Sequence, residues 1–254
     1  MTDHPLIRNP RTYARLSGLA YLAIIGLGIF AQMGVRGQII DWSDAGATAD
    51  QIRLDPLLLR AGILADLTVF ALDIVLAVMF YRLLAPAGRG LALFAMAVRI
   101  TMTAVLCVNL LNMMAPLVLL GDSPIAAQLD PAMADAASLV FLGLHNEGYI
   151  LGLMLFGLHC ACLGILLARA DYFPAFLGWL MGLSGLSYIA LGIIHVGLPE
   201  SGAIGGLLLL PAALPEFVFT GWLLAVGLNR SRWDAVMDRQ RTSRARIEPS
   251  SART

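Results

Sequence analysis

Long apolar stretches, separated by short polar segments, make up most of the 254-residue chain. Each holds some 20 or more mainly apolar residues, about the length with which an α-helix crosses the ~30 Å hydrocarbon core of a membrane. The pattern predicts an all-α polytopic membrane protein, a bundle of six transmembrane helices. The predicted spans are Leu16–Val35, Ala61–Leu84, Leu91–Leu120, Ser138–Ala168, Ala175–Leu198 and a last one within Ala203–Leu228.

Three regions follow from this division of the chain. Residues 1–15 form a short polar lead, residues 16–228 the transmembrane domain, and residues 229–254 an Arg-rich tail that we expect to be mostly disordered. Pro211 and Pro215 lie in the last span and predict that its helix is interrupted.

The arginines predict the orientation. Thirteen of them flank the spans on the side of the two termini and three lie on the other side, while Arg99 is inside a span. Basic residues accumulate on the cytoplasmic side of a membrane. We therefore expect both termini in the cytoplasm and an even number of spans. The Arg-, Ala- and Gly-rich usage favours a bacterial cytoplasmic (inner) membrane.

Composition narrows the function classes. The chain is 59% hydrophobic, its mean hydropathy is +0.79 and its formal net charge is zero, which leaves no sizeable soluble domain. No basic patch or phosphate-binding motif is present, so no nucleic acid partner is expected. The three cysteines form no CxxC pair and no HExxH occurs, so we predict no metal site, and the cofactor is unknown.

Two charged residues in adjacent spans lie at similar depth. Asp73 is about 11 residues from the cytoplasmic end of its span, and Arg99 about 8 residues into the next one. Across a tight hairpin this predicts a buried ion pair. The pair could simply lock the two spans together, because an unpaired charge is costly in a bilayer.

Other polar side chains are predicted to gather in the external half of the membrane. Together they could line a ligand-binding cavity, or the outermost could simply lie at the level of the lipid head groups. No catalytic residue can be assigned among them. The candidates are Asp66, Asn109, Asn112, His145, Glu147, His195 and Glu216.

A short sequence repeat links two distant spans. Leu16–Ala23 reads LSGLAYLA and Leu183–Ala190 reads LSGLSYIA. Both segments lie on spans predicted to run outward, so a duplicated hairpin is conceivable. In a chain this rich in Leu, Ala and Gly, chance similarity is the alternative.

Three stretches carry a family resemblance: Leu57–Leu84, Leu144–Gly164 (LHNEGYILGLMLFGLHCACLG) and Phe173–Tyr188 (FPAFLGWLMGLSGLSY). Together they resemble a bacterial family of multi-pass membrane proteins catalogued only as a domain of unknown function (domain of unknown function 4386). The resemblance implies a membrane protein of about six spans. It brings no activity, substrate or catalytic residue.

Three functions therefore remain open from the sequence. The first is binding or carrying a small amphiphile or lipid in the outer polar layer. The second is an intramembrane enzyme that uses Asp66, His145, Glu147 or Glu216 as acid or base on a lipid-like substrate. The third is a structural or regulatory role, with the Arg-rich tail touching anionic lipid or an unknown protein partner.

Overall fold

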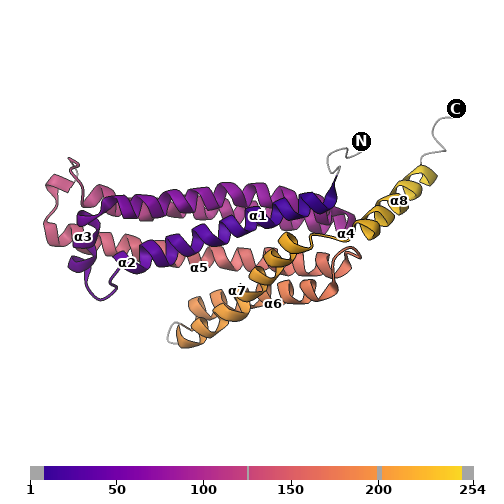
Figure 1. Ribbon diagram of the computed structural model, residues 1–254. Helices are drawn as coiled ribbons and strands as arrows, with labels where there is room; N and C mark the ends of the chain where they lie inside the picture. The colour runs from indigo at the N-terminus through magenta and orange to yellow at the C-terminus, as the bar shows by residue number, and fades with distance from the viewer. Residues whose placement is uncertain (1–8, 125, 199–201, 248–254) are drawn as a thin grey trace, which may run out of the picture.

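The computed structural model describes residues 9–124, 126–198 and 202–247, and the side chains of all of these except 202–206 and 244–247. Residues 1–8 of the expected lead and 248–254 of the expected tail lie outside the described residues. Every regular element in the described ranges is a helix (Figure 1). The long helices are α1 (Pro10–Ile29), α4 (Pro56–Leu119), α5 (Pro131–Arg169), α6 (Ala175–Gly197) and α7 (Gly202–Ala225). The shorter ones are the π-helix η1 (Phe30–Arg36), α2 (Gly37–Ile39), α3 (Ala45–Leu54), the 3-10 helix η2 (Ala126–Gln128) and α8 (Arg230–Ile247).

Five helices in the described ranges are long and apolar enough to cross a membrane, and the longest of them, α4, folds back on itself. Its 64 residues are broken by extended backbone at Gly88. Asp73 and Arg99 are 26 residues apart in sequence, which is about 39 Å along a straight helix, yet their side chains are hydrogen-bonded. The two halves of α4 are therefore antiparallel arms packed side by side.

Three of the long helices begin with the same local signal. Asn9, Asp55 and Asp130 each precede a proline, and each side chain accepts hydrogen bonds from backbone N–H groups of the first helical turn. An Asn or Asp at the N-cap satisfies donors that have no partner within the helix, and proline at the next position lacks an N–H to satisfy. The local sequence therefore determines where these three helices begin.

The expected interruption of the last span is wrong. α7 continues through both Pro211 and Pro215. The hydroxyl of Ser184 on α6 donates to the carbonyl oxygen of Ala212, between the two prolines, at 2.6 Å. A neighbouring helix thus supplies a donor to this turn, which is how proline is accommodated inside membrane helices.

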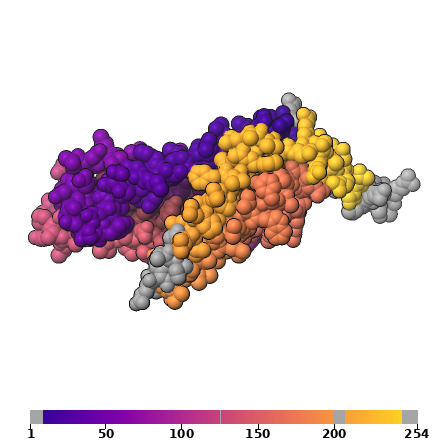
Figure 2. Space-filling view, turned by 60° about the horizontal axis from the view of Figure 1, so that its bottom comes forward, coloured from indigo at the N-terminus to yellow at the C-terminus, as the bar shows by residue number. Residues whose placement is uncertain are grey.

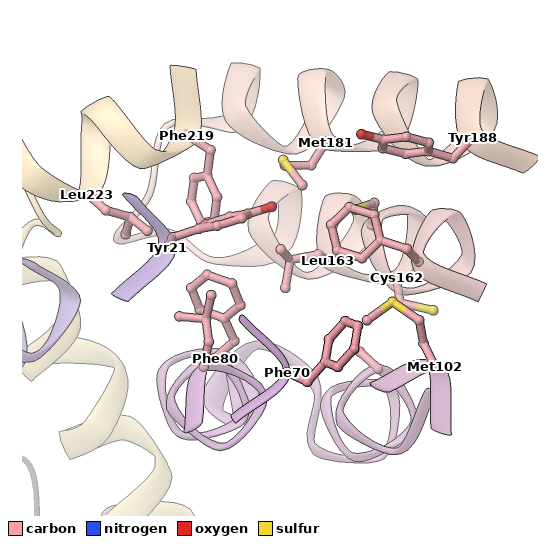
Figure 3. Packing of buried hydrophobic residues seen from close by; sticks show 14 of the residues in the cluster. Tyr21, Phe70, Phe80, Met102, Cys162, Leu163, Met181, Tyr188, Phe219 and Leu223 are labelled. Carbon is pink, nitrogen blue, oxygen red and sulfur yellow. The ribbon is translucent and has the colours of Figure 1, made fainter. Parts of the chain in front are cut away.

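Aromatic side chains join α1, α4 and α7 near the middle of the bundle. The rings of Tyr21, Phe80 and Phe219 pack as a triangle, with centroids 5.9 Å apart for Tyr21 and Phe80, 6.5 Å for Tyr21 and Phe219 and 5.6 Å for Phe80 and Phe219 (Figure 3). Edge-to-face contacts of this kind add to the attraction from buried area alone. All three rings are at most 4% exposed, so the bundle is closely packed here.

Glycines bring α5 and α6 into close contact. A Cβ atom added at Gly164 would lie 2.6 Å from the backbone nitrogen of Gly182 and 2.8 Å from the carbonyl oxygen of Gly178. Such close approach of two backbones is typical of membrane helix pairs with small residues at the contact. The backbones of α5 and α6 are therefore tightly packed against each other.

The start of α1 meets the end of α7. Arg11 Nε donates to the carbonyl oxygen of Val226 at 3.0 Å, and Arg15 donates to that of Ala225 at 2.9 Å. Gly227 follows with φ +74°, a left-handed conformation that ends helices and favours glycine. We call this side of the bundle the terminal end, and the opposite side, which carries α3, the α3 end (Figure 1).

The expectation of a mostly disordered tail is wrong for the described residues up to Ile247. Asn229 caps α8 by accepting a hydrogen bond from the backbone of Arg232, and Trp233 packs edge-on against Tyr172 with centroids 4.8 Å apart. Composition favours disorder here because the segment is rich in arginine and other polar residues. Docking of one buried tryptophan on the α5–α6 loop is a tertiary contact that composition does not report.

At the α3 end the chain extends beyond the apolar spans. Arg53 of α3 forms a 2.5 Å ion pair with Asp135 in the first turns of α5. This hydrogen bond to Asp135 raises the pKa of Arg53. The contact ties α3 across the start of α5.

Candidate functional site

A pocket of about 440 Å³ opens toward the α3 end, between η1, α5, α6 and α7. The apolar part of its lining, called here the apolar wall, is made of Leu142, Ile150, Leu153, Leu191, Ile194 and Leu209. The polar part, called the polar wall, is made of Gln32, Arg36, His145, Asn146, Tyr149 and His195, and Trp42 also lines the pocket. The volume lies within the range of small-molecule sites.

The pocket exists because α1 and α7 diverge. The two helices touch near the terminal end, where a Cβ atom on Gly18 would lie 2.8 Å from that of Leu223. Toward the α3 end, Gln32 and Leu209 line the pocket instead of packing on each other. In Figure 2 the indigo and orange parts of the surface separate, and the pink surface of α5 is visible between them.

A buried ion pair forms the polar end of the pocket. Arg36 NH1 donates to Asp66 Oδ2 at 2.6 Å, and Arg36 Nε donates to Gln32 Oε1 at 2.8 Å. Both charged side chains are less than 10% exposed. Arg36 ends the π-helix η1, an irregular geometry that is frequent at functional sites. Arg36 itself lines the pocket, whereas Asp66 stands behind it.

His145 presents an unpaired nitrogen beside this pair. The residue is 3% exposed, and its Nδ1 lies 3.3 Å from the backbone oxygen of Asn109 and 3.2 Å from that residue's side-chain Nδ2. Asn109 also donates to the backbone oxygen of His145 at 2.8 Å, and Asn112 donates to Asn109. His145 Nε2, in contrast, is buried without a hydrogen-bond partner in the described structure. This nitrogen has almost no accessible surface, so it does not open into the pocket as the structure stands.

Tyr149 completes the polar wall. Its ring lies 5.8 Å from the guanidinium carbon of Arg36 and 6.2 Å from the ring of His145, measured between centroids for the two rings. The three side chains are therefore close enough to contact one small head group together.

Five of the seven predicted site residues lie at the pocket or directly behind it. His145 and His195 line the pocket. Asp66, Asn109 and Asn112 stand behind it, where they hold Arg36, His145 and Asn109, respectively.

Glu147 and Glu216 have other surroundings. Glu147 forms a 2.6 Å pair with His195, and both side chains of this pair are at least one-third exposed. Glu216 is not part of the outer layer: it lies deeper, where its two carboxylate oxygens accept hydrogen bonds from Tyr21 and Tyr188 at 2.7 and 2.6 Å.

The sequence interpretation missed Arg36 and Tyr149. Arg36 was assigned to an external loop, although it lies at the outer end of one span and Asp66 at the outer start of the next. The depth comparison that predicts the Asp73–Arg99 pair would have found this pair too. Tyr149 carried a signal as well, because it lies one helical turn from His145 on the same face.

The Asp73–Arg99 pair forms as the depth of the two residues predicts. Arg99 is 1% exposed, and both Nε and NH2 donate to Asp73 Oδ1. Its NH1 lies 3.2 Å from His159 Nε2, while His159 Nδ1 donates to the carbonyl oxygen of Ala95 at 2.9 Å. Tyr21 and Phe156 lie on the guanidinium with centroids 5.4 and 5.3 Å away. The pair links the two arms of α4 to α1 and α5.

The repeated motif converges on Glu216. Tyr21 occupies the same position in LSGLAYLA as Tyr188 in LSGLSYIA, and each hydroxyl donates to one oxygen of the Glu216 carboxylate. Ser17 and Ser184, the paired serines of the motif, are both fully buried. Equivalent segments of α1 and α6 thus contact α7 through the same carboxylate, that of Glu216.

Metal ligation is not suggested by this geometry. Within the described ranges, no three His, Cys, Asp or Glu side chains lie close enough together to hold a metal ion. The polar groups of the pocket are instead suited to hydrogen bonding and charge pairing with an organic ligand.

The apolar helices, the buried ion pairs and the pocket together define an integral membrane protein with several membrane-spanning helices. Residues 16–227 match the family described as Domain of unknown function (DUF4386), and the chain belongs to this family. No curated protein and no solved structure matches the chain significantly.

Proposed function

We propose that this protein binds or carries a small amphiphile or lipid in the pocket between η1, α5, α6 and α7. The observation that carries the proposal is a pocket of about 440 Å³ whose lining combines polar side chains, among them Arg36 and Tyr149, with leucine and isoleucine side chains. A ligand with a polar head and an apolar chain would pair the polar groups and cover the apolar ones.

Access from the membrane supports the same function. The pocket lies where α1 and α7 separate, and lipid-facing residues such as Met33 and Leu210 are at least 70% exposed on either side of the gap. An amphiphile dissolved in the bilayer could enter sideways with its head at the level of Arg36. An enzymatic function has less support, since His145 is the only one of the four acid or base candidates in the pocket lining.

The membrane arrangement belongs to the proposal as well. Counting the two arms of α4 separately, we propose six crossings of a bacterial inner membrane, with both termini in the cytoplasm. The contacts between the start of α1 and the end of α7 support an even number of crossings, and the arginine distribution supports the orientation.

Cysteine labelling tests this topology. In a variant without Cys107, Cys160 and Cys162, we expect Asp122→Cys to react with a membrane-impermeant maleimide in intact spheroplasts. Ser231→Cys should react only after permeabilisation. The opposite pattern would reverse the orientation, and labelling of both positions from outside would contradict the three crossings proposed between these two residues.

Filling the pocket tests the proposed binding. We expect protein extracted gently from its own membrane to carry a bound amphiphile in native mass spectrometry, and Leu153→Trp to lose it, because the larger ring occupies the apolar wall. Leu151→Trp is the matched control: Leu151 lies two residues away on the same helix, is 50% exposed and does not line the pocket. A ligand-free wild type, or retention by Leu153→Trp, would contradict the proposal.

A further inference from the structure

The polar wall of the pocket also points to a ligand class. We infer that the bound amphiphile has one apolar chain and a compact anionic head, a carboxylate or a phosphate, contacted by Arg36 and Tyr149. This inference rests on the proposed function and adds the chemistry of the head group.

Charge is the first argument. Among the described residues that line the pocket there is no carboxylate, whereas Arg36 carries a permanent positive charge. Asp66 offsets part of this charge from behind, at 2.6 Å, but does not reach the lining. A head group in the pocket therefore meets the cation first. An amine head would be repelled, and an anion would form a buried Asp66–Arg36–anion series in which opposite charges alternate.

Hydrogen-bond donors are the second argument. Arg36 uses two of its five N–H donors on Gln32 and Asp66 within the described structure, so its guanidinium has donors left for a ligand. The ring of Tyr149 lies 5.8 Å from the guanidinium carbon of Arg36, and a tyrosine hydroxyl can donate as well. A carboxylate or phosphate has several acceptor oxygens and can use such donors at the same time.

Pocket size is the third argument. A volume of about 440 Å³ lies toward the lower end of the range for ligand sites, which suits one chain better than two. Leu153 and Leu191 are among the apolar side chains that line the pocket. One chain would lie along them with its head at Arg36.

The test compares probes that share one chain. Protein in nanodiscs of zwitterionic lipid is titrated with radiolabelled dodecanoate, dodecyl phosphate, dodecanol and dodecylamine, with empty nanodiscs as the background. We expect dodecanoate or dodecyl phosphate to bind at least about tenfold more tightly than dodecanol or dodecylamine, the size of one charge-assisted hydrogen bond.

Variants then assign the effect to the polar wall. Arg36→Gln should weaken binding of the anionic probe at least about tenfold and leave dodecanol unchanged. Because this change also leaves Asp66 without its partner, Arg36→Gln/Asp66→Asn serves as a second variant that removes both charges while keeping hydrogen-bonding groups of similar size.

The outcomes separate the two proposals. Equal affinities for dodecanoate, dodecyl phosphate and dodecanol, all lost in Leu153→Trp, would overturn the anionic head while leaving the pocket as a binding site. Preference for dodecylamine would overturn it too. Absence of saturable binding for all four probes would count against the proposed function itself.

Discussion

Replacing Arg99 by methionine is expected to lower the free energy of unfolding by about 3–5 kcal/mol, the usual cost of breaking a buried ion pair from one side. Arg99 is 1% exposed and is hydrogen-bonded to Asp73, which would remain as an uncompensated carboxylate in the middle of the bundle. The contacts of the guanidinium with Tyr21 and Phe156 would be lost as well. Denaturant unfolding in mixed micelles measures the effect.

A double variant distinguishes charge burial from packing. Asp73→Leu/Arg99→Met removes both charges and should be less destabilised than the sum of the two single variants, with a coupling energy of at least about 1 kcal/mol. The matched control is Arg53→Met, because Arg53 is 37% exposed and pairs with Asp135 at the surface, where such pairs contribute about 0–1 kcal/mol. An Arg99 variant no less stable than the Arg53 variant would refute a central role for the buried pair.

Replacing Gly164 by alanine is expected to cost about 1–3 kcal/mol of stability, because one added methyl group overpacks the contact between α5 and α6. The new Cβ atom would approach the backbone of Gly178 and Gly182 to 2.6–2.8 Å, and backbone atoms cannot move aside as the end of a side chain can. The two helices would have to separate. Unfolding in mixed micelles, as for Arg99, measures the loss.

Gly182→Ala is the control for this variant. Gly182 lies in the same interface, yet a Cβ atom added there meets nothing within 4 Å. It should leave stability unchanged or raise it slightly, since alanine favours the helix over glycine by roughly 1 kcal/mol. Equal stabilities of the two variants would show that the close contact does not limit stability.

The helical architecture follows largely from local sequence. Apolar length predicts the spans, and the Asn–Pro and Asp–Pro pairs mark where three long helices begin. The Asp73–Arg99 contact is predictable for a related reason: depth along a helix is set by counting residues, and a tight hairpin brings equal depths together. A buried charge also needs a partner, which narrows the choice.

The candidate site was predictable only in part. The sequence marks His145 and His195 as polar residues near one membrane face, and both line the pocket. It does not reveal that Glu216 lies outside this layer, because that depends on how α7 is rotated against α1 and α6. Arg36 was missed because the first span was ended at Val35, one residue short of Arg36 and inside the π-helix that carries it into the bundle.

By itself, then, the sequence determined the class of protein, its long apolar helices and one buried charge pair, because hydrophobicity, chain length and depth are local properties. Only the tertiary structure decided that α7 stays helical through two prolines, that Trp233 docks α8, and that the two copies of the repeat meet at Glu216. It also decided where α1 and α7 separate to leave a pocket beside Arg36 and His145. These features depend on the rotation and spacing of helices far apart in the chain, which arise from packing over the whole bundle.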